Sequence, residues 1–308
     1  MSRRPRDPSR LLCRVAIAGA GRAGGALAAA LADSGVADVR LWGRDRSRAR
    51  TTARRSGARL ATDVPALLEG ADLLVVAVRD EALEAVARRL ARGWPQAAGP
   101  TAALHLAGAH PSERLGALRE RGIPAGVFHP VVSLDGPRSR DAFRGRTATI
   151  SGDPLARRVA RALARRLGMD AVAVDDRERP LVHLAAVMAA GDTTALLGGA
   201  TELLVASGIA RPRARRLLAS LARSALDGFE RSGPARAMTG PVPRADVATL
   251  AAHLEGLARS HLPGATRRLV EEAHRALVRL GASQLAASGR LDAAARRRVT
   301  RSVEKPRA

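Results

Sequence analysis

The stretch from Val15 to Gly35, VAIAGAGRAGGALAAALADSG, constrains the fold of this 308-residue chain more than any other. A short apolar run is followed by a glycine-rich turn and then by an uninterrupted Ala/Leu segment, which predicts a buried strand, a tight turn and a helix. In a dinucleotide-binding unit the first glycine permits the turn, the second lets backbone approach a diphosphate, and the third allows close packing. The helix N-terminus then faces the phosphates. The alternative is a strand–helix turn that is merely tight. We predict a cofactor-binding loop of Gly19, Ala20, Gly21, Arg22, Ala23 and Gly24.

Strands and helices alternate from residue 11 to about 110, which is typical of a parallel sheet covered on both faces. Predicted strands cover 13–18, 38–42, 71–78, 101–106, 126–128, 147–151 and 170–174. Predicted helices in this part cover 23–34, 46–56, 81–91 and 155–167. From about residue 177 every segment has helical periodicity, with helices at 181–207, 211–231, 244–260, 264–280 and 291–303.

The fold class is therefore α/β, with an N-terminal Rossmann doubly wound parallel sheet followed by an all-helical C-terminal domain. We expect a disordered basic arm at 1–10 and a Rossmann NADP-binding domain at 11–175. A helical substrate and dimerisation domain is expected at 176–290, and a basic tail at 291–308. The apolar helix 181–207 favours a homodimer through the helical domain.

Composition narrows the classes of protein to which this chain could belong. The chain carries a formal net charge of +23, but all but one of its 52 basic residues are arginine and they are spread over most predicted helices. Aromatic residues that would stack on bases make up 2% of the chain, so we expect a solvated basic surface that attracts anions and no specific nucleic-acid site. A single cysteine, Cys13, rules out an internal disulfide and favours a reducing compartment. The sequence shows no signal peptide and no apolar run of about 20 residues, so we expect a cytoplasmic protein without a membrane span.

The cofactor preference depends on the end of the second strand. An acidic residue there holds the ribose of NAD, whereas arginine accommodates the 2′-phosphate of NADP. The sequence there is Trp42-Gly43-Arg44-Asp45-Arg46. Arg44 and Arg46 favour NADP, whereas Asp45 leaves NAD as an alternative cofactor. Further cofactor contacts are expected where later strands end, at Val78 and Gly108.

Several motifs occur in a characteristic order: GAGRAG at 19–24, HLAGA at 105–109, FHPVVSL at 128–134, FRG at 143–145, HLAAV at 183–187, TGPVPRAD at 239–246 and HL at 253–254. On these residues the chain from 11 to 285 resembles the Rossmann-like proteins with a C-terminal domain of unknown function 2520. That family is similar to the 6-phosphogluconate dehydrogenase, pyrroline-5-carboxylate reductase and ketopantoate reductase group. The resemblance implies an NADP-dependent oxidoreductase.

The chain departs from the family patterns HTSGA, YHAAAVFASN and LTGPxxRGD. It has Ala107 for the serine, Val182 for the tyrosine, Gly191 for the asparagine and Ala245 for the glycine. The serine and asparagine regions face the nicotinamide and the substrate in related reductases. Asp192 lies one position past the missing asparagine and is a candidate to replace it.

Hydride transfer to a carbonyl or imine carbon needs a proton donor within hydrogen-bond reach of the oxygen or nitrogen. His129 follows a predicted strand, where sites of such sheets lie, and is the first candidate; the alternative is a buried histidine that fixes the loop. His183 is a second candidate or a capping residue of its helix. Arg244 would clamp a substrate carboxylate or is an exposed charge.

No histidine or cysteine spacing indicates a metal site, and no G-x-S-x-G indicates a serine hydrolase. We therefore expect an NADP-dependent reduction of a small, anionic carbonyl or imine compound, with a 2-oxo acid such as ketopantoate as one candidate. The alternative is an NADP-binding sensor or partner protein without turnover, which the changes at Ala107 and Gly191 favour.

Overall fold

A computed structural model describes residues 12–94, 99–134 and 140–304. The predicted arm at 1–10 and the last four residues of the predicted tail lie outside the described residues. The described chain forms two compact units, which divide between Val187 and Met188.

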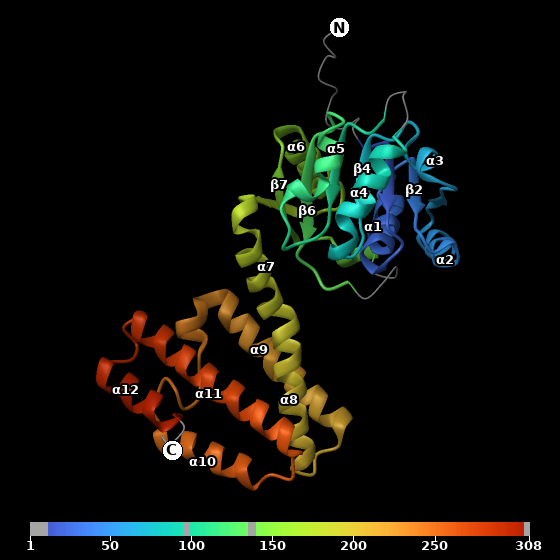
Figure 1. The fold of residues 1–308 in the computed structure, drawn as a ribbon. Coiled ribbons are helices and arrows are strands. Elements are labelled where there is room, and N and C mark those ends of the chain that lie inside the picture. Colours follow the sequence, from blue (N-terminus) through green and yellow to red (C-terminus); the bar gives the residue numbers. More distant parts are fainter. Residues whose placement is uncertain (1–11, 95–98, 135–139, 305–308) are drawn as a thin grey trace. The chain divides into compact units, whose positions relative to one another are not determined.

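In the described part of the first unit, eight strands form one sheet in the order β3-β2-β1-β4-β5-β6-β7-β8 (Figure 1). The strands are β1 (Arg14–Ala18), β2 (Asp38–Trp42), β3 (Arg59–Leu60), β4 (Leu73–Val76), β5 (Ala102–His105), β6 (Ala125–Pro130), β7 (Thr147–Gly152) and β8 (Asp170–Ala173). All neighbouring pairs are parallel except β6 and β7, which run antiparallel. The predicted Rossmann sheet is thus confirmed as a parallel-dominated sheet.

Helices cover both faces of the sheet because its strands are apolar on both sides. One face packs against α1 (Arg22–Asp33), α2 (Arg46–Ser56) and α6 (Pro154–Arg166), around core residues such as Leu27, Leu104 and Phe128. The other packs against α3 (Val64–Leu68), α4 (Leu83–Arg92) and α5 (Gly116–Arg119), around Leu74 and Leu90. Short 3₁₀ turns, η2 (Asp80–Ala82), η3 (Ser112–Leu115), η4 (Arg140–Ala142) and η5 (Asp176–Glu178), occur between them.

The helix expected at 181–207 is interrupted. The chain forms α7 (Arg179–Val187), a π-helical turn η6 (Met188–Asp192) and α8 (Thr193–Ala206). Thr193, the first residue of α8, donates from Oγ1 to the Met188 carbonyl at 3.0 Å, which provides a partner for a backbone group that the wider turn displaces. The π turn contains Gly191 and Asp192.

The helical segment Asp176–Ala206, which includes the π turn, is long and apolar enough, by length and composition, to cross a membrane. The expectation that no such segment exists is wrong, because it relied on uninterrupted apolar residues, and His183 and Asp192 break the run. One such helix is weak evidence for a span, since a helix that packs against another protein passes the same test.

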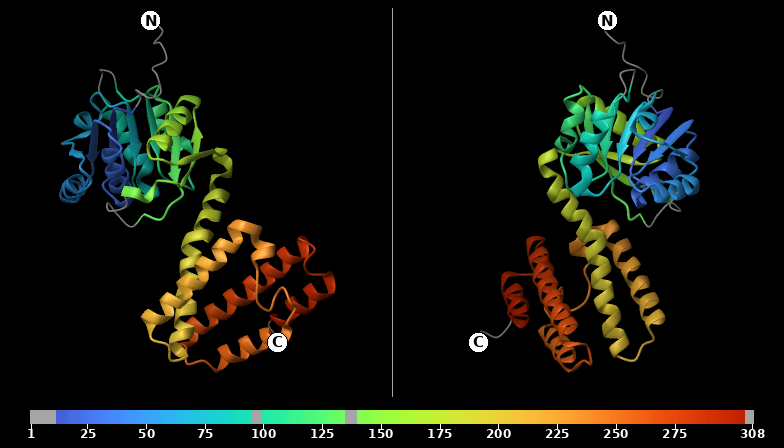
Figure 2. Two further views of the ribbon diagram at one scale, coloured as in Figure 1. Left: turned by 180° about the vertical axis from the view of Figure 1, so that it is seen from behind. Right: turned by 45° about the vertical axis from the view of Figure 1, so that its right-hand side comes forward.

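The second unit contains α8, α9 (Arg211–Ala237), α10 (Val247–Arg259), α11 (Gly264–Ala287) and α12 (Ala293–Ser302). Helices α8, α9 and α11 lie side by side, as the turned views show (Figure 2). The helical backbone of α9 is broken at Gly233, where φ is 73°.

Residues 291–303, expected as part of a tail, instead complete the core of the second unit. Leu291, Ala295, Val299 and Val303 are buried against residues of α10 and α11. They recur every four residues, so Ala295 and Val299 form an apolar face of α12 that Leu291 and Val303 extend at its two ends. The many arginines of this segment obscure this face in the sequence.

Candidate active site

The glycine loop after β1 has the features that a bound diphosphate requires. Gly19 has φ 135°, and a Cβ there would lie 2.1 Å from the Ala77 carbonyl oxygen; a Cβ on Gly24 would lie 2.0 Å from the Gly19 carbonyl oxygen. A Cβ on Gly21, by contrast, would meet nothing within 4 Å. The first and third glycines therefore allow close packing, and the second leaves bare backbone facing open space.

Helix α1 begins at this bare backbone. Gly21 is its N-cap and supplies no side-chain hydrogen bond, and no acidic residue occupies the first turn. The N–H groups and the positive dipole end are therefore available to an anion. The residues present fit a dinucleotide, which Gly19, Ala20, Gly21, Arg22, Ala23 and Gly24 would hold.

A pocket of about 380 Å³ adjoins the loop. It lies between the start of α1 and the first turns of α2, and its lining is polar and rich in arginine. The lining residues are Ala20, Gly21, Arg22, Asp45, Ser47, Arg48, Thr51, Thr52 and Arg55.

The two arginines that the sequence singled out do not line this pocket. Arg46 donates to the Thr62 carbonyl, and Arg44 is exposed. Asp45 caps α2 by accepting from the Arg48 backbone N–H at 2.9 Å, so one carboxylate oxygen is engaged locally. Sequence reasoning missed Arg48 and Arg55, for which the one signal was their place on a helix after β2.

A second group of predicted residues meets after β5 and β6. A Cβ on Gly108 would lie 2.5 Å from His183 Nδ1 and 2.7 Å from His129 Nε2, so both imidazoles face the bare backbone of Gly108. The two rings have centroids 5.5 Å apart in an edge-to-face arrangement. Three residues that the sequence named separately, from the loop after β5, from β6 and from α7, thus form one cluster.

The two imidazoles differ in their partners. His129 Nδ1 donates to the Leu106 carbonyl at 3.0 Å, so in the neutral ring Nε2 is the unprotonated nitrogen. His183 Nδ1 is buried and has no hydrogen-bond partner within the described residues. An orphaned buried nitrogen of this kind indicates a place for a ligand or water.

Burial lowers the pKa of His129, and the His183 and Arg179 side chains lower it further, against the effect of the Leu106 carbonyl. His105, at the end of β5, has no exposed surface and bonds the Pro111 carbonyl through Nε2 at 3.1 Å. Burial lowers the pKa of His105 to about 4. His105 and His129 are therefore neutral near pH 7.

The remaining predicted residues belong to other elements. Val78 is half-buried, just after β4. Asp192 in η6 and Arg244 before α10 both have exposed side chains in the second unit. Ala245, which replaces the family glycine, adopts φ 50°. Among the described residues, no three histidine, cysteine or acidic side chains come together as a metal site would require.

Two family models match different parts of the chain. Residues 147–282 match the domain of unknown function 2520, and residues 14–98 match the NADP oxidoreductase family described as coenzyme F420-dependent. The chain is a Rossmann-like protein with a C-terminal DUF2520 domain. The resemblance seen in the sequence is confirmed, and with it the NADP oxidoreductase class of this DUF2520 protein.

Solved structures support the fold of the DUF2520 protein. A Bacteroides fragilis protein assigned as an NADP oxidoreductase is 25% identical, with a TM-score of 0.69 over 86% of this chain and 97% of its own. An Aspergillus terreus reductive aminase, in complex with NADPH4, cyclohexanone and allyl amine, is 22% identical, with a TM-score of 0.60 over 85% and 93%. Plasmodium falciparum pyrroline carboxylate reductase with NADP bound is 11% identical, with a TM-score of 0.57 over 94% and 98%. No curated protein matches the DUF2520 protein in sequence.

Proposed function

We propose that this protein uses NADPH to reduce the C=O or C=N bond of a small anionic compound. The observation that carries the proposal is the pairing of two features at the carboxyl ends of parallel strands. Bare backbone at Gly21 follows β1, and two imidazole nitrogens surround Gly108 after β5. Sites of such sheets lie at this edge.

NADPH, when bound, supplies the hydride. The chain would bind its diphosphate through Gly21 and the N-terminus of α1, and Arg22 and Arg48 in the adjoining pocket are placed to attract the 2′-phosphate. Val78, Arg44 and Arg46 remain proposed contacts from the sequence. The bond to be reduced would lie beside Gly108, next to His129 Nε2 and His183 Nδ1.

The anionic character of the substrate is proposed from the net charge of +23 and from Arg244, which would pair with a carboxylate. Asp192, in the π turn and one residue past the family's asparagine position, is a further candidate. A 2-oxo acid such as ketopantoate and a cyclic imine carboxylate both have this chemistry.

Binding and turnover are tested separately. NADPH and NADH are titrated against the full chain by fluorescence, and NADPH oxidation is then followed with a panel of 2-oxo acids and cyclic imines. For an active substrate, His129→Asn and His183→Asn should each lower kcat about 10²- to 10⁴-fold without changing the Kd for NADPH. His261→Asn, an exposed residue of the second unit, is the control.

Failure to bind either coenzyme would refute the proposal. Binding without turnover across the whole panel would favour a second candidate, an NADP-binding sensor or partner. Ala107 and Gly191 favour that candidate, because they lack the polar groups that the family pattern places there.

We infer that the protein is a homodimer through its helical unit. In α8 and α9 only Thr201 and Ala214 are buried, although both helices are rich in apolar residues. The large exposed apolar side chains of α9 are Leu217, Leu221, Leu226 and Phe229. An exposed apolar surface of this kind marks an interface.

Light scattering tests this inference at micromolar concentration. The wild-type chain should have twice the monomer mass, and Leu221→Glu with Phe229→Glu should lower it to that of the monomer. A wild-type monomer would contradict the inference. Arg223→Glu, a change on the same helix at a residue that is charged already, is the control.

We also infer a cytoplasmic protein that recognises neither nucleic acid nor a membrane. DNA retention, if it occurs, should arise from net charge alone and be lost between about 50 and 200 mM salt. Retention that depends on DNA sequence, or co-sedimentation with neutral lipid vesicles, would contradict this.

A further inference from the structure

Arg179, the first residue of α7, is a guanidinium with no exposed surface. Its Nε donates to the His110 carbonyl at 3.2 Å, and its Nη1 lies 3.5 Å from Thr149 Oγ1. A buried charge is costly, so such groups are normally paired and fully hydrogen-bonded.

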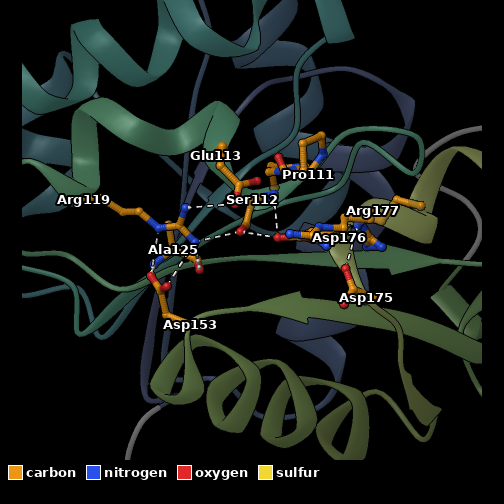
Figure 3. A network of polar contacts seen from close by, with 11 residues as sticks. Pro111, Ser112, Glu113, Arg119, Ala125, Asp153, Asp175, Asp176 and Arg177 are labelled. Atoms are coloured by element: carbon orange, nitrogen blue, oxygen red, sulfur yellow. Dashed lines mark hydrogen bonds and ion pairs between the residues drawn. The ribbon is translucent and has the colours of Figure 1, made fainter.

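Arg179 is neither fully paired nor fully bonded. Its Nη2 has no partner within the described residues, and the Asp176 carboxylate approaches its Nε only to 3.9 Å. The other oxygen of Asp176 accepts from Ser112 Oγ at 2.6 Å, and Arg119 Nη2 donates to that same hydroxyl at 2.7 Å. Figure 3 shows this network, in which Asp176 is directed at Ser112.

Hydrogen bonds from Ser112 lower the pKa of Asp176 although burial opposes them, so Asp176 is a carboxylate. Burial lowers the pKa of Arg179 to about 10, so Arg179 is still a cation at neutral pH. The fold therefore keeps a poorly compensated positive charge inside the first unit, which is the kind of local conflict expected where a residue serves a site.

Strand register places this charge beside the histidines. His129 in β6 lies directly opposite Thr149 in the antiparallel strand β7, and residues that are opposite each other point to the same face. Thr149 contacts Arg179, so the guanidinium lies against the face that carries His129. His105 pairs with Val127, two residues before His129, and therefore shares that face.

We propose that Arg179 is a positioning residue that keeps His129 in its neutral form, protonated on Nδ1, so that Nε2 remains a hydrogen-bond acceptor beside Gly108. The Leu106 carbonyl can only accept, which fixes the proton on Nδ1. A second proton on Nε2 would create an imidazolium next to the buried guanidinium.

Other groups around His129 also raise or lower its pKa. Burial lowers the pKa of His129 most, and among the neighbouring side chains His183, on α7, lowers it more than Arg179 does. His105, on β5, is itself kept neutral by burial, with its pKa lowered to about 4. Asp80, in η2, favours the imidazolium but contributes least of the neighbouring charges. Arg179 is the neighbour whose positive charge persists at every physiological pH.

This assignment has a chemical consequence, which rests on the proposed function. A neutral His129 offers a lone pair and no proton at Nε2. A protonated imine brings its own N–H, which Nε2 would accept, and hydride addition to its carbon gives a neutral amine without any further proton. A carbonyl compound becomes an alkoxide on hydride addition and needs a proton that this form of His129 does not carry. The site therefore suits an iminium substrate better than a ketone.

Nuclear magnetic resonance of histidine side chains tests the proposal on the full chain without cofactor. Nitrogen shifts give the tautomer of His129, and a pH titration gives its midpoint, with His129→Gln to assign the signals. The variants are Arg179→Gln, which removes the charge, and Arg179→Lys, which keeps a charge. Arg177→Gln, at an exposed position two residues earlier, is the matched control.

We expect wild-type His129 to be the Nδ1–H tautomer and to titrate below the range of a free histidine. Arg179→Gln should move the midpoint to higher pH, whereas Arg179→Lys and Arg177→Gln should leave it near the wild-type value. An unchanged midpoint in Arg179→Gln, or the same upward shift in Arg179→Lys, would overturn the proposal.

If Arg179→Gln does not fold, the wild-type spectrum still decides. An imidazolium at pH 7, or an Nε2–H tautomer, would show that Arg179 does not set the state of His129. These measurements need no cofactor or substrate. Loss of the proposed function would therefore appear in the NADPH titration and in the substrate panel, and not here.

Discussion

Alanine at Gly21 and alanine at Gly24 should have opposite consequences, because the two glycines are required for different reasons. A Cβ on Gly24 would lie 2.0 Å from the Gly19 carbonyl oxygen, a distance that forces backbone to move. Such overpacking costs about 1–3 kcal/mol, against a gain of about 0.5–1 kcal/mol for alanine over glycine within a helix. The net cost is at most about 2.5 kcal/mol, so Gly24→Ala should lower the Tm of the first unit by up to roughly 10 °C.

Gly21→Ala should leave stability unchanged or slightly higher. Gly21 has φ −79° and ψ −170°, a conformation open to any residue, and a Cβ there meets nothing within 4 Å. The new methyl group would instead occupy the space where the diphosphate approaches. Losing one hydrogen bond to a charged group costs about 1.5–3 kcal/mol, which corresponds to a Kd for NADPH weaker by roughly 10- to 150-fold.

Calorimetric titration with NADPH and thermal unfolding measure the two effects. Gly116→Ala is the control, since its Cβ also meets nothing within 4 Å but lies on α5, away from the loop. Wild-type affinity in Gly21→Ala would refute the assignment of the loop as the diphosphate site. A large fall in Tm for Gly21→Ala would show that its backbone does not face open space.

Three further predictions concern the cofactor, acid stability and backbone strain. Arg48→Ala should weaken the binding of NADPH far more than the binding of NADH, and Arg44→Asp should do the same if Arg44 also reaches the phosphate. Parallel titrations of both coenzymes measure these affinities. An equal loss of affinity for both coenzymes would contradict the role of the 2′-phosphate. His105 has a pKa lowered to about 4 in the fold, so the unfolded chain takes up its proton first as the pH falls from about 6.5. The contribution of neutral His105 to the free energy of unfolding is therefore lost between about pH 6.5 and 4, and it amounts to roughly 3 kcal/mol. In urea unfolding, the free energy of unfolding of His105→Gln should fall less over that pH range than that of the wild type. Ala245 adopts φ 50°, so Ala245→Gly should raise the free energy of unfolding of the second unit by about 1 kcal/mol; a decrease would mean that the alanine methyl packs usefully.

Much of the fold follows from local pattern. The Val15–Gly35 stretch and the apolar run before Val78 predict central strands, because a strand buried on both faces must be apolar throughout. The antiparallel pairing of β6 and β7 was not predicted, since strand direction depends on the path of the intervening chain. The packing of residues 291–303 was missed because arginines surround its apolar positions.

The candidate site was predicted as separate residues and not as a cluster. Gly108, His129 and His183 each had a sequence signal, a strand end or a family motif, but nothing in the spacing showed that both imidazoles would face one glycine. Arg179 had no signal at all in a chain in which nearly every basic residue is arginine. Its importance is visible only through its burial and its contact with Thr149.

The sequence by itself determined the order of strands, turn and helix around residues 19–24, because glycine geometry and apolar periodicity act over a few residues. It also determined the family, through motifs whose order survives substitution. Only the tertiary structure decided which side chains share a face of β5, β6 and β7, because a shift of register by one residue moves every side chain to the opposite face. The neutral imidazole beside Gly108 is therefore a property of strand register and burial, which no local stretch of this chain specifies.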